Sequence, residues 1–254
     1  IQKVEYFEND DLAKLVDFDA LQKFRDNALN PEHPVTRGTA QNPDIYFQAR
    51  EAASKFYDPV PDIVEEYMQE ITKLTGREYH PFTYYGAEDA ENVIVAMGSV
   101  TATIKEVVDY KLAQGEKVGL ITVHLYRPFS EKYFMKALPK SVKRIAVLDR
   151  TKEPGANGEP LYLDIRELFY GKENAPIVVG GRYGLSSKDT TPAQIISVYD
   201  NLNLPEAKNH FTVGIVDDVK FTSLPLLPEI SVVQKGTFEG KFYGIGSDGT
   251  VGAN

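Results

Sequence analysis

The sequence contains no cysteine, and this absence narrows the chemistry open to it. Disulfide bonds, thiolate catalysis and iron–sulfur clusters held by cysteine are excluded within these 254 residues. No apolar run reaches the roughly 18 residues that a membrane-spanning helix needs. The histidines stand far apart, without the spacing of metal ligands, at His33, His80, His124 and His210. The chain itself therefore offers none of the ligand patterns typical of cluster or zinc proteins.

Positive charge is also in short supply. Lysine and arginine total 28 against 37 aspartate and glutamate residues, which gives a net charge of -9. Such a chain repels nucleic acid and anionic membrane, so neither is expected as a partner. The apolar fraction of 42% is ordinary for a globular protein with a core of its own. The first residue is Ile1 rather than methionine, which suggests a piece cut from a longer chain.

The first 76 residues predict helices on either side of a long loop. Apolar residues recur at helical spacing over 11–29 and again over 62–76, where Gly76 suits a helix end. Between them, residues 30–61 are rich in proline and other turn formers. A loop of this length is usually functional or packs against another domain.

Residues 90–203 alternate short apolar strands with helices. Strands are predicted near 92–98, 117–124, 144–149 and 176–180, and helices over 101–115, 130–142, 160–171 and 191–202. Because the strands are apolar on both faces, they predict a parallel α/β sheet, doubly wound with right-handed crossovers and covered by helices on both sides. Residues 211–219 could add an edge strand, and 219–240 have the composition of a linker.

Three motifs follow predicted strands, where open α/β sheets place their ligands. Gly98 and Ser99 end the first strand, but no second glycine completes a dinucleotide fingerprint, so a plain turn remains an alternative. Charges follow the third strand, and they suit either a ligand site or exposed ion pairs: Asp149, Arg150, Lys152 and Glu153. Glycines and bases follow the fourth, and they suit either anion binding or a tight turn with a structural ion pair: Gly180, Gly181, Arg182, Gly184 and Lys188.

The residues alone do not identify an activity. The sequence has no readable Ser–His–Asp arrangement, paired carboxylates or nucleotide P-loop. Arg37 and Arg50 are suited to carboxylate or phosphate, although the residues alone favour an ordered interdomain loop. An independent small-molecule binding module, which uses the strand ends near Gly98, Arg150 and Gly181, fits these observations.

Four stretches spread over essentially the whole chain carry a family resemblance. They are NPEHPVTRGTAQNPDIYFQARE (30–51), VAMGSVTATIKEVVDYKLAQGEKVGLITVHLYRPFS (95–130), AVLDRTKEPGANGEPLYLDI (146–165) and KFYGIGSDGTVGAN (241–254). Together they resemble pyruvate:ferredoxin (flavodoxin) oxidoreductase. The resemblance implies an anaerobic-type cytoplasmic enzyme that decarboxylates pyruvate on thiamine pyrophosphate, passes electrons through iron–sulfur clusters, and forms acetyl-coenzyme A.

The resemblance also implies a division of the chain. Residues 1–75 look like the tail of the first, thiamine-enzyme type domain with a linker helix. Residues 76–218 look like core domain II, similar to the transketolase carboxyl-terminal domain, and 219–254 like a linker and the start of the gamma domain. The sequence lacks both cysteine and a Gly-Asp-Gly motif. The fragment is therefore expected to be inactive alone, and to hold neither thiamine pyrophosphate, nor magnesium, nor clusters.

Two groups of residues become site candidates through the resemblance. The terminal glycine loop suits the phosphates of coenzyme A, with Gly246, Ser247, Gly249 and Thr250 as the binding residues. The loop around RGTAQNPD is expected near the active site or a domain boundary, through Arg37, Thr39, Gln41 and Asn42. The partners implied are the remaining domains, a second copy of the enzyme in a homodimer, and ferredoxin or flavodoxin.

Overall fold

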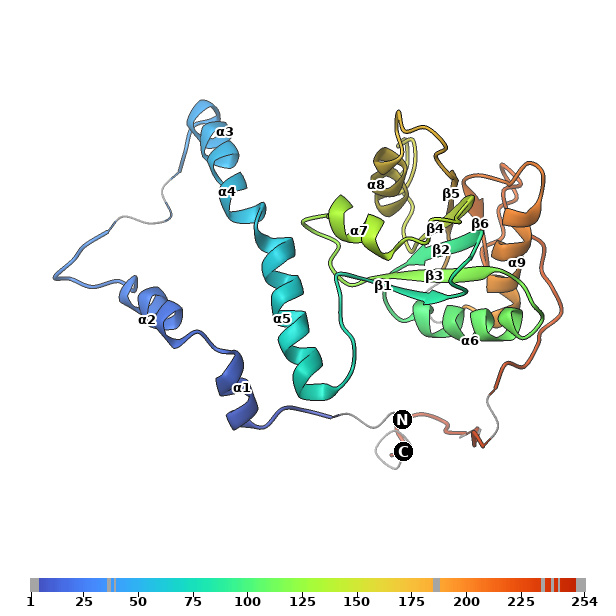
Figure 1. Cartoon of the computed structure of the whole chain (residues 1–254), viewed down its shortest axis with the longest axis horizontal. Coiled ribbons are helices and arrows are strands. Elements are labelled where there is room, and N and C mark those ends of the chain that lie inside the picture. Colours follow the sequence, from blue (N-terminus) through green and yellow to red (C-terminus); the bar gives the residue numbers. More distant parts are fainter. Residues whose placement is uncertain are drawn as a thin grey trace.

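The chain folds into a helical arm joined to an α/β core (Figure 1). The structure is a computed structural model of the whole chain, and it describes residues 5–35, 38, 40–184, 188–233, 236–238, 240–241 and 243–249. The arm lies to one side of the core in Figure 1. Its last helix lies between the other helices of the arm and the core.

The arm is built from helices in chain order: α1 (Asn9–Leu15), α2 (Phe18–Asp26), α3 (Pro43–Ala52), α4 (Ser54–Tyr57) and α5 (Val60–Thr75). The single helix predicted within 11–29 is wrong, because two helices meet there. Val16 is extended, with ψ at 124°, and the Asp17 side chain accepts a hydrogen bond from the Ala20 amide at 2.9 Å. Asp17 therefore starts a new helix by capping it.

The prediction of a loop over 30–61 is wrong in its second half. Helices α3 and α4 occupy most of residues 43–57. Pro43 stands at the first position of α3, where proline is favoured, so it begins a helix here instead of interrupting one. The predicted end of α5 is confirmed, since Gly76 caps it with φ at 70°.

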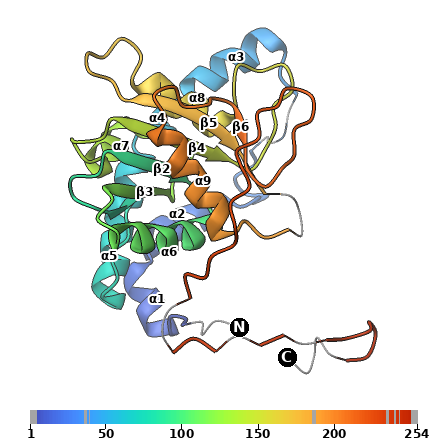
Figure 2. The same cartoon turned by 90° about the vertical axis from the view of Figure 1, so that its right-hand side faces the viewer.

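Within the described residues, six strands form one sheet in the order β1-β3-β2-β4-β5-β6. The part of this order from β3 to β6 can be followed in Figure 2. The strands are β1 (Phe82–Gly86), β2 (Asn92–Ala96), β3 (Val118–Val123), β4 (Arg144–Asp149), β5 (Ile177–Arg182) and β6 (Phe211–Thr212). The predicted parallel sheet is confirmed, because β3, β2, β4, β5 and β6 pair in parallel. The antiparallel edge strand β1 was not predicted.

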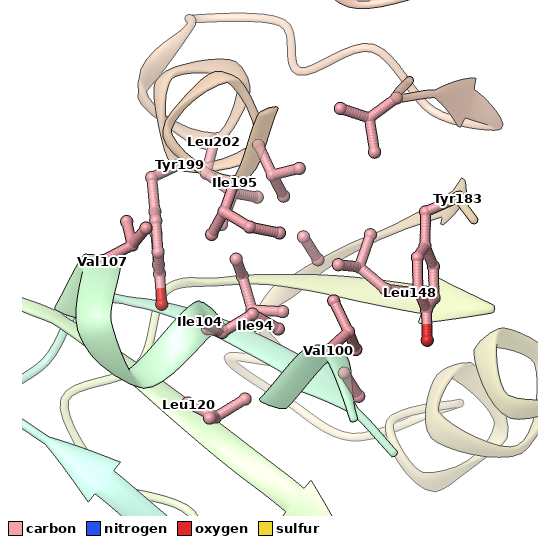
Figure 3. Close-up of a cluster of buried hydrophobic side chains, with 14 of the residues drawn as sticks. Ile94, Val100, Ile104, Val107, Leu120, Leu148, Tyr183, Ile195, Tyr199 and Leu202 are labelled. Atoms are coloured by element: carbon pink, nitrogen blue, oxygen red, sulfur yellow. The ribbon is translucent and has the colours of Figure 1, made fainter. Parts of the chain in front are cut away.

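Helices cover both faces of the sheet, as predicted. They are α6 (Val100–Leu112), α7 (Glu131–Ala137), α8 (Pro160–Leu168) and α9 (Pro192–Asn203). Alternate residues of each strand point to opposite faces. Ile94 of β2 therefore packs with α6 and α9 in the cluster of Figure 3, whereas Val93 and Val95 pack with α7 and α8. All five residues of β2 are buried, which explains its continuous apolar sequence.

Polar contacts join α5 to the core. The Asp62 carboxylate accepts hydrogen bonds from Lys132 Nζ at 2.7 Å and from the Tyr133 hydroxyl at 2.6 Å. One turn later, the Glu65 carboxylate lies 3.0 Å from Nδ1 of His80, just before β1. These contacts hold α5 on α7 and the β1 edge. No helix in the described part of the chain is long and apolar enough to cross a membrane.

Candidate functional site

The three strand-end motifs converge on one edge of the sheet. Strands β2, β4 and β5 are parallel neighbours, so their carboxyl ends lie side by side. Gly98 follows β2 with φ at 78°, a conformation that glycine adopts without strain, and it leads directly into α6. Arg150 follows β4, and Gly184 lies beside it after β5. This edge is the place where open α/β sheets bind ligands.

A cavity of about 340 Å³ opens at this edge between the ends of β2 and β4. From β2 the chain crosses to β3 on one side and then to β4 on the other, so the sheet reverses its order here. Such a reversal leaves a crevice outside the strand ends. The cavity is lined in part by Gly98, Ser99, Tyr126, Asp149, Arg150 and Thr151. The edge therefore combines hydroxyl, carboxyl and guanidinium groups around one space.

Asp149 ends β4 and anchors the helix that follows. Its two carboxylate oxygens accept hydrogen bonds from the amides of Leu161 and Tyr162, each at 3.0 Å, at the start of α8. Burial raises the pKa of Asp149 above its usual value, although the two amides act in the opposite direction. The carboxyl group therefore ties the end of β4 to the start of α8, and both of its oxygens are already engaged.

The structural ion pair that the fourth motif also suited lies buried under the same edge, with Glu159 as a partner that was not predicted. Arg182 Nη1 is 3.4 Å from Glu159 Oε1, and Nη2 donates to the His210 carbonyl oxygen at 3.0 Å. Both side chains are nearly inaccessible, with Glu159 exposed by only 2%. Among the described residues, Glu159 Oε2 has no hydrogen-bond partner. Its position directly before Pro160 at a helix start was the only signal available in the sequence.

The glycines of the fourth motif serve two different purposes. A Cβ atom at Gly181 would lie 2.1 Å from the Phe211 ring, and one at Gly180 would lie 2.8 Å from the Tyr162 ring. These two glycines are required by close packing inside the core. Gly184 instead has φ at 83°, and a Cβ there would meet the Arg150 side chain at 2.8 Å. Only Gly184 therefore contributes to the shape of the edge itself.

The same edge continues into a larger cavity, of about 490 Å³, over the ends of β4, β5 and β6. It shares Arg150, Thr151 and Tyr183 with the smaller one. Lys152 lines this larger cavity, whereas Lys188 lines a third one nearby, of about 460 Å³. Glu153 is exposed and lines none of these three spaces.

The terminal loop is exposed and separate from the sheet edge. Gly246 and Gly249 adopt positive φ angles of 85° and 80°, and Ser247 has φ at 51°. The Asp248 carboxylate accepts a hydrogen bond from the Ile245 amide at 2.9 Å. A Cβ at either glycine would meet nothing within 4 Å, so the backbone there is open to approach. Thr250 lies outside the described residues.

The loop before α3 is likewise apart from the sheet edge. Arg37 and Thr39 lie outside the described residues. Gln41 and Asn42 are exposed, and Asn42 occupies the cap position of α3 without making a side-chain cap hydrogen bond. Figure 1 places α3 in the arm, away from the carboxyl ends of β2 and β4. In the part of the chain that the structure describes, no group of three or more His, Asp or Glu side chains could hold a metal ion.

Comparisons with known proteins agree along the whole chain. A family model described as pyruvate:ferredoxin oxidoreductase core domain II matches residues 90–195. A second model, described as the thiamine diphosphate-binding part of pyruvate flavodoxin/ferredoxin oxidoreductase, matches residues 1–69. The chain is 61% identical over 255 residues to the pyruvate-flavodoxin oxidoreductase of Enterobacter agglomerans. It is 58% identical over 254 residues to the pyruvate:ferredoxin oxidoreductase of Moorella thermoacetica.

These relatives are much longer than the chain. Each comparison covers 100% of this chain but only 22% of the relative, so the chain spans about a fifth of their length. Among solved structures, a 2-oxoglutarate:ferredoxin oxidoreductase from Magnetococcus marinus is 18% identical, with a TM-score of 0.38 over 53% of this chain and 21% of that one. A TM-score this low supports no further conclusion.

Proposed function

Because this chain belongs to the pyruvate:ferredoxin (flavodoxin) oxidoreductase family, we propose that it forms part of an enzyme that oxidises pyruvate. That enzyme decarboxylates pyruvate, transfers the acetyl group to coenzyme A and passes electrons to ferredoxin or flavodoxin. The observation that carries the proposal is the agreement, over the entire chain, with relatives named for this reaction. The chain's own part is structural: it joins domains and contacts other subunits.

The residues present do not fit the cofactors that the complete reaction needs. Iron–sulfur clusters are normally held by cysteine thiolates, and the chain has none. No Gly-Asp-Gly stretch is available for the metal and diphosphate of thiamine pyrophosphate. We therefore assign thiamine pyrophosphate, magnesium and the clusters to the remaining polypeptide of the longer enzyme, which we propose acts as a homodimer.

The arm supports a contact role. In helices α1 to α4 the structure has no buried residue. Several large apolar side chains are more than half exposed there: Phe18, Phe24, Ile45, Tyr46, Phe47, Phe56 and Tyr57. Exposed apolar surface of this extent is typical of an interface. Since residues 1–69 match the thiamine diphosphate-binding family model, we propose that the remaining polypeptide of that domain covers this surface.

The domain division stays a proposal, with one adjusted boundary. We assign 1–75 to the first domain and linker helix, and we assign the α/β core to the second. Leu224 is buried with the core, and the Ser197 hydroxyl donates to the Pro225 carbonyl oxygen at 2.9 Å. These contacts favour ending the second domain near residue 225 instead of 218. The residues that follow then form the linker and the start of the third domain.

The terminal loop is our proposed coenzyme A contact, through Gly246, Ser247, Gly249 and Thr250. Glycines with positive φ and open space around them let a phosphate approach the backbone amides. The Asp248 carboxylate would repel a phosphate, but it accepts from the Ile245 amide on its own side of the turn. The loop therefore meets the steric requirement of a phosphate site.

A glycine substitution in the longer enzyme tests this loop. Gly249→Val should raise the Michaelis constant for coenzyme A about tenfold, because one or two hydrogen bonds from backbone amides to the charged phosphate are lost. The Michaelis constant for pyruvate should change little. Gly236→Val is the matched control, because Gly236 also has positive φ and open space but precedes the loop. If the two variants have the same Michaelis constant for coenzyme A, the loop is only a turn and does not bind coenzyme A.

Dye reduction tests the function as a whole. The longer enzyme that contains this chain should reduce a viologen dye with pyruvate, thiamine pyrophosphate and coenzyme A, whereas the 254-residue chain alone should not. Activity of the isolated chain would refute the structural role. If the longer enzyme does not act on pyruvate but does act on another 2-oxoacid, the proposed substrate is wrong. The proposed structural role of this chain then still holds.

A further inference from the structure

We propose that the larger cavity at the carboxyl edge, over β4, β5 and β6, is a binding site for an organic phosphate with an apolar group. The proposal goes beyond the pyruvate reaction, and it concerns a site separate from the terminal glycine loop. It rests on three features of the cavity: its position on the sheet, a basic wall, and an apolar lip.

The position is the one where parallel sheets bind ligands. The cavity measures about 490 Å³, which is large enough for a small organic molecule. Its floor is rigid because the strand ends are tied together: the Tyr183 amide donates to the Asp149 carbonyl oxygen at 3.2 Å, and the Val213 amide donates to the Arg182 carbonyl oxygen at 3.0 Å. A ligand would therefore meet a preformed surface.

The wall formed by the ends of β4 and β5 is basic. Arg150 and Lys152 line it, and the buried Arg182 stands behind them. Arg150 lies across Gly184, where any Cβ atom would displace its side chain. The glycine thus makes room for the guanidinium at the cavity wall. Arginine and lysine together suit phosphate, because the guanidinium donates two parallel hydrogen bonds and the ammonium adds a point charge.

The opposite lip carries both acidic and apolar groups. Asp217 belongs to it, but its carboxylate already accepts from the amides of Val219, Lys220 and Thr222 and from the Thr222 hydroxyl. These donors lower the pKa of Asp217, led by the Lys220 amide, and they turn its charge toward its own backbone. Lys220 adds a positive charge to the lip, and the exposed Asp218 a negative one.

The apolar part of the lip explains why an organic ligand fits better than a bare ion. Val216 and Val219 line the cavity with 81% and 78% of their surface exposed, and Ile215 lies beside them. An apolar or aromatic group packed on these side chains would remove them from water while its phosphate met Arg150 and Lys152. ADP satisfies both requirements and serves as the probe.

The test is hydrogen exchange of the longer enzyme, followed by mass spectrometry, with and without ADP. Peptides that cover 150–153 and 215–220 should exchange more slowly when ADP is present. This readout separates the cavity from other phosphate sites of the enzyme, because each site protects its own peptides. Protection should appear at a lower concentration of ADP than of inorganic phosphate. It should also weaken as salt is added, because the contacts are ionic.

Variants then assign the protection to the basic wall. Arg150→Gln or Lys152→Gln should raise the ADP concentration for half protection about tenfold, the usual effect of losing one charged hydrogen bond. Lys143→Gln is the matched control, because Lys143 precedes the same strand at its opposite end and should change nothing.

Three results would overturn the proposal. The first is wild-type enzyme without protection of these peptides at millimolar ADP. The second is protection that both wall variants leave unchanged. The third is binding by the 254-residue chain but not by the longer enzyme, which would mean that other polypeptide covers the cavity. None of these results bears on viologen reduction by pyruvate, so a failure here leaves the proposed function standing.

Discussion

The arm and the core differ in what covers their apolar side chains. In the core, every residue of β2 and β3 is buried, and helices from the same segment close both faces of the sheet. In the arm, Phe24 and Phe47 are exposed by 76% and 69% on helices with no buried residue. Both regions carry large apolar residues, so composition does not distinguish them. The core completes its own interior, whereas we propose that the arm presents one side of an interface.

The contrast is explained by chain connectivity. A parallel strand needs a crossover before the next strand, and each crossover supplies a helix that covers the sheet. The arm has helices but no sheet or bundle to cover. Among the described residues of the arm, α5 is the helix that contacts the core, through Asp62 and Glu65. The arm is therefore expected to gain most of its stability from polypeptide outside this chain.

The largest expected effect comes from truncating one apolar residue in each region. Ile94→Ala should lower the free energy of unfolding of the core by about 2–5 kcal/mol, because Ile94 is fully buried and a cavity would remain. Phe24→Ala should change the stability of the isolated chain by less than about 0.5 kcal/mol. Urea unfolding of both variants measures the difference.

The longer enzyme reverses one half of this comparison. There Phe24→Ala should cost more than about 1 kcal/mol, since the ring would leave a space in an interface. Ile94→Ala should cost the same in both contexts. Equal effects of Phe24→Ala in the short and long proteins would mean that the arm stays solvated, and the contact role would then be lost.

Much of the core could be predicted because its signal is local. Strands buried on both faces are mostly apolar, and β2 to β5 stand out because each contains a continuous apolar run. The strand β1 was missed because most of its residues are only partly buried and its partner β3 is distant in sequence, with Phe82 paired to Val123. The arm was misjudged at Pro43, since proline breaks a helix in its interior but favours the first turn.

The convergence of the site could be predicted, but its chemistry could not. Parallel strands place their carboxyl ends at one edge, so Gly98 and Arg150 were expected near each other. The pairing of Arg182 with Glu159, and the contact of Gly181 with Phe211, depend on packing between distant segments. Local sequence does not identify the two partners of such contacts. Gln41 and Asn42 are exposed, and we propose that their roles depend on surfaces outside this chain.

A smaller effect is expected at the loop that joins α2 to α3. We propose that Arg37, with its neighbours Thr39, Gln41 and Asn42, lies at a domain boundary near the active centre. Arg37→Ala in the longer enzyme should lower turnover or the melting temperature. The loss of activation or unfolding free energy should be at most about 1.5–3 kcal/mol, the contribution of a hydrogen bond to a charged group. Steady-state kinetics and thermal unfolding of the variant and the wild type measure it. Unchanged values for both quantities would remove the loop from the site.

The smallest expected effect is a difference in how the stability contributions of Asp62 and Asp149 depend on pH. Lys132 and then Tyr133 lower the pKa of Asp62, where α5 meets the core, below its usual 3.8, whereas burial raises the pKa of Asp149 above 3.8. The stabilisation from Asp62 is present above pH 3.8 and is lost as the pH falls through its lowered pKa. The contribution from Asp149 is present below pH 3.8 and is lost as the pH rises through its raised pKa.

Urea unfolding between pH 3 and 7 tests this difference. When the free energy of unfolding of each variant, Asp62→Asn or Asp149→Asn, is subtracted from that of the wild type, the two differences should change with pH in opposite directions. Asp149→Asn also weakens the cap of α8, but that loss is a constant offset. Slopes of the same sign would mean that one carboxyl group does not have the surroundings described.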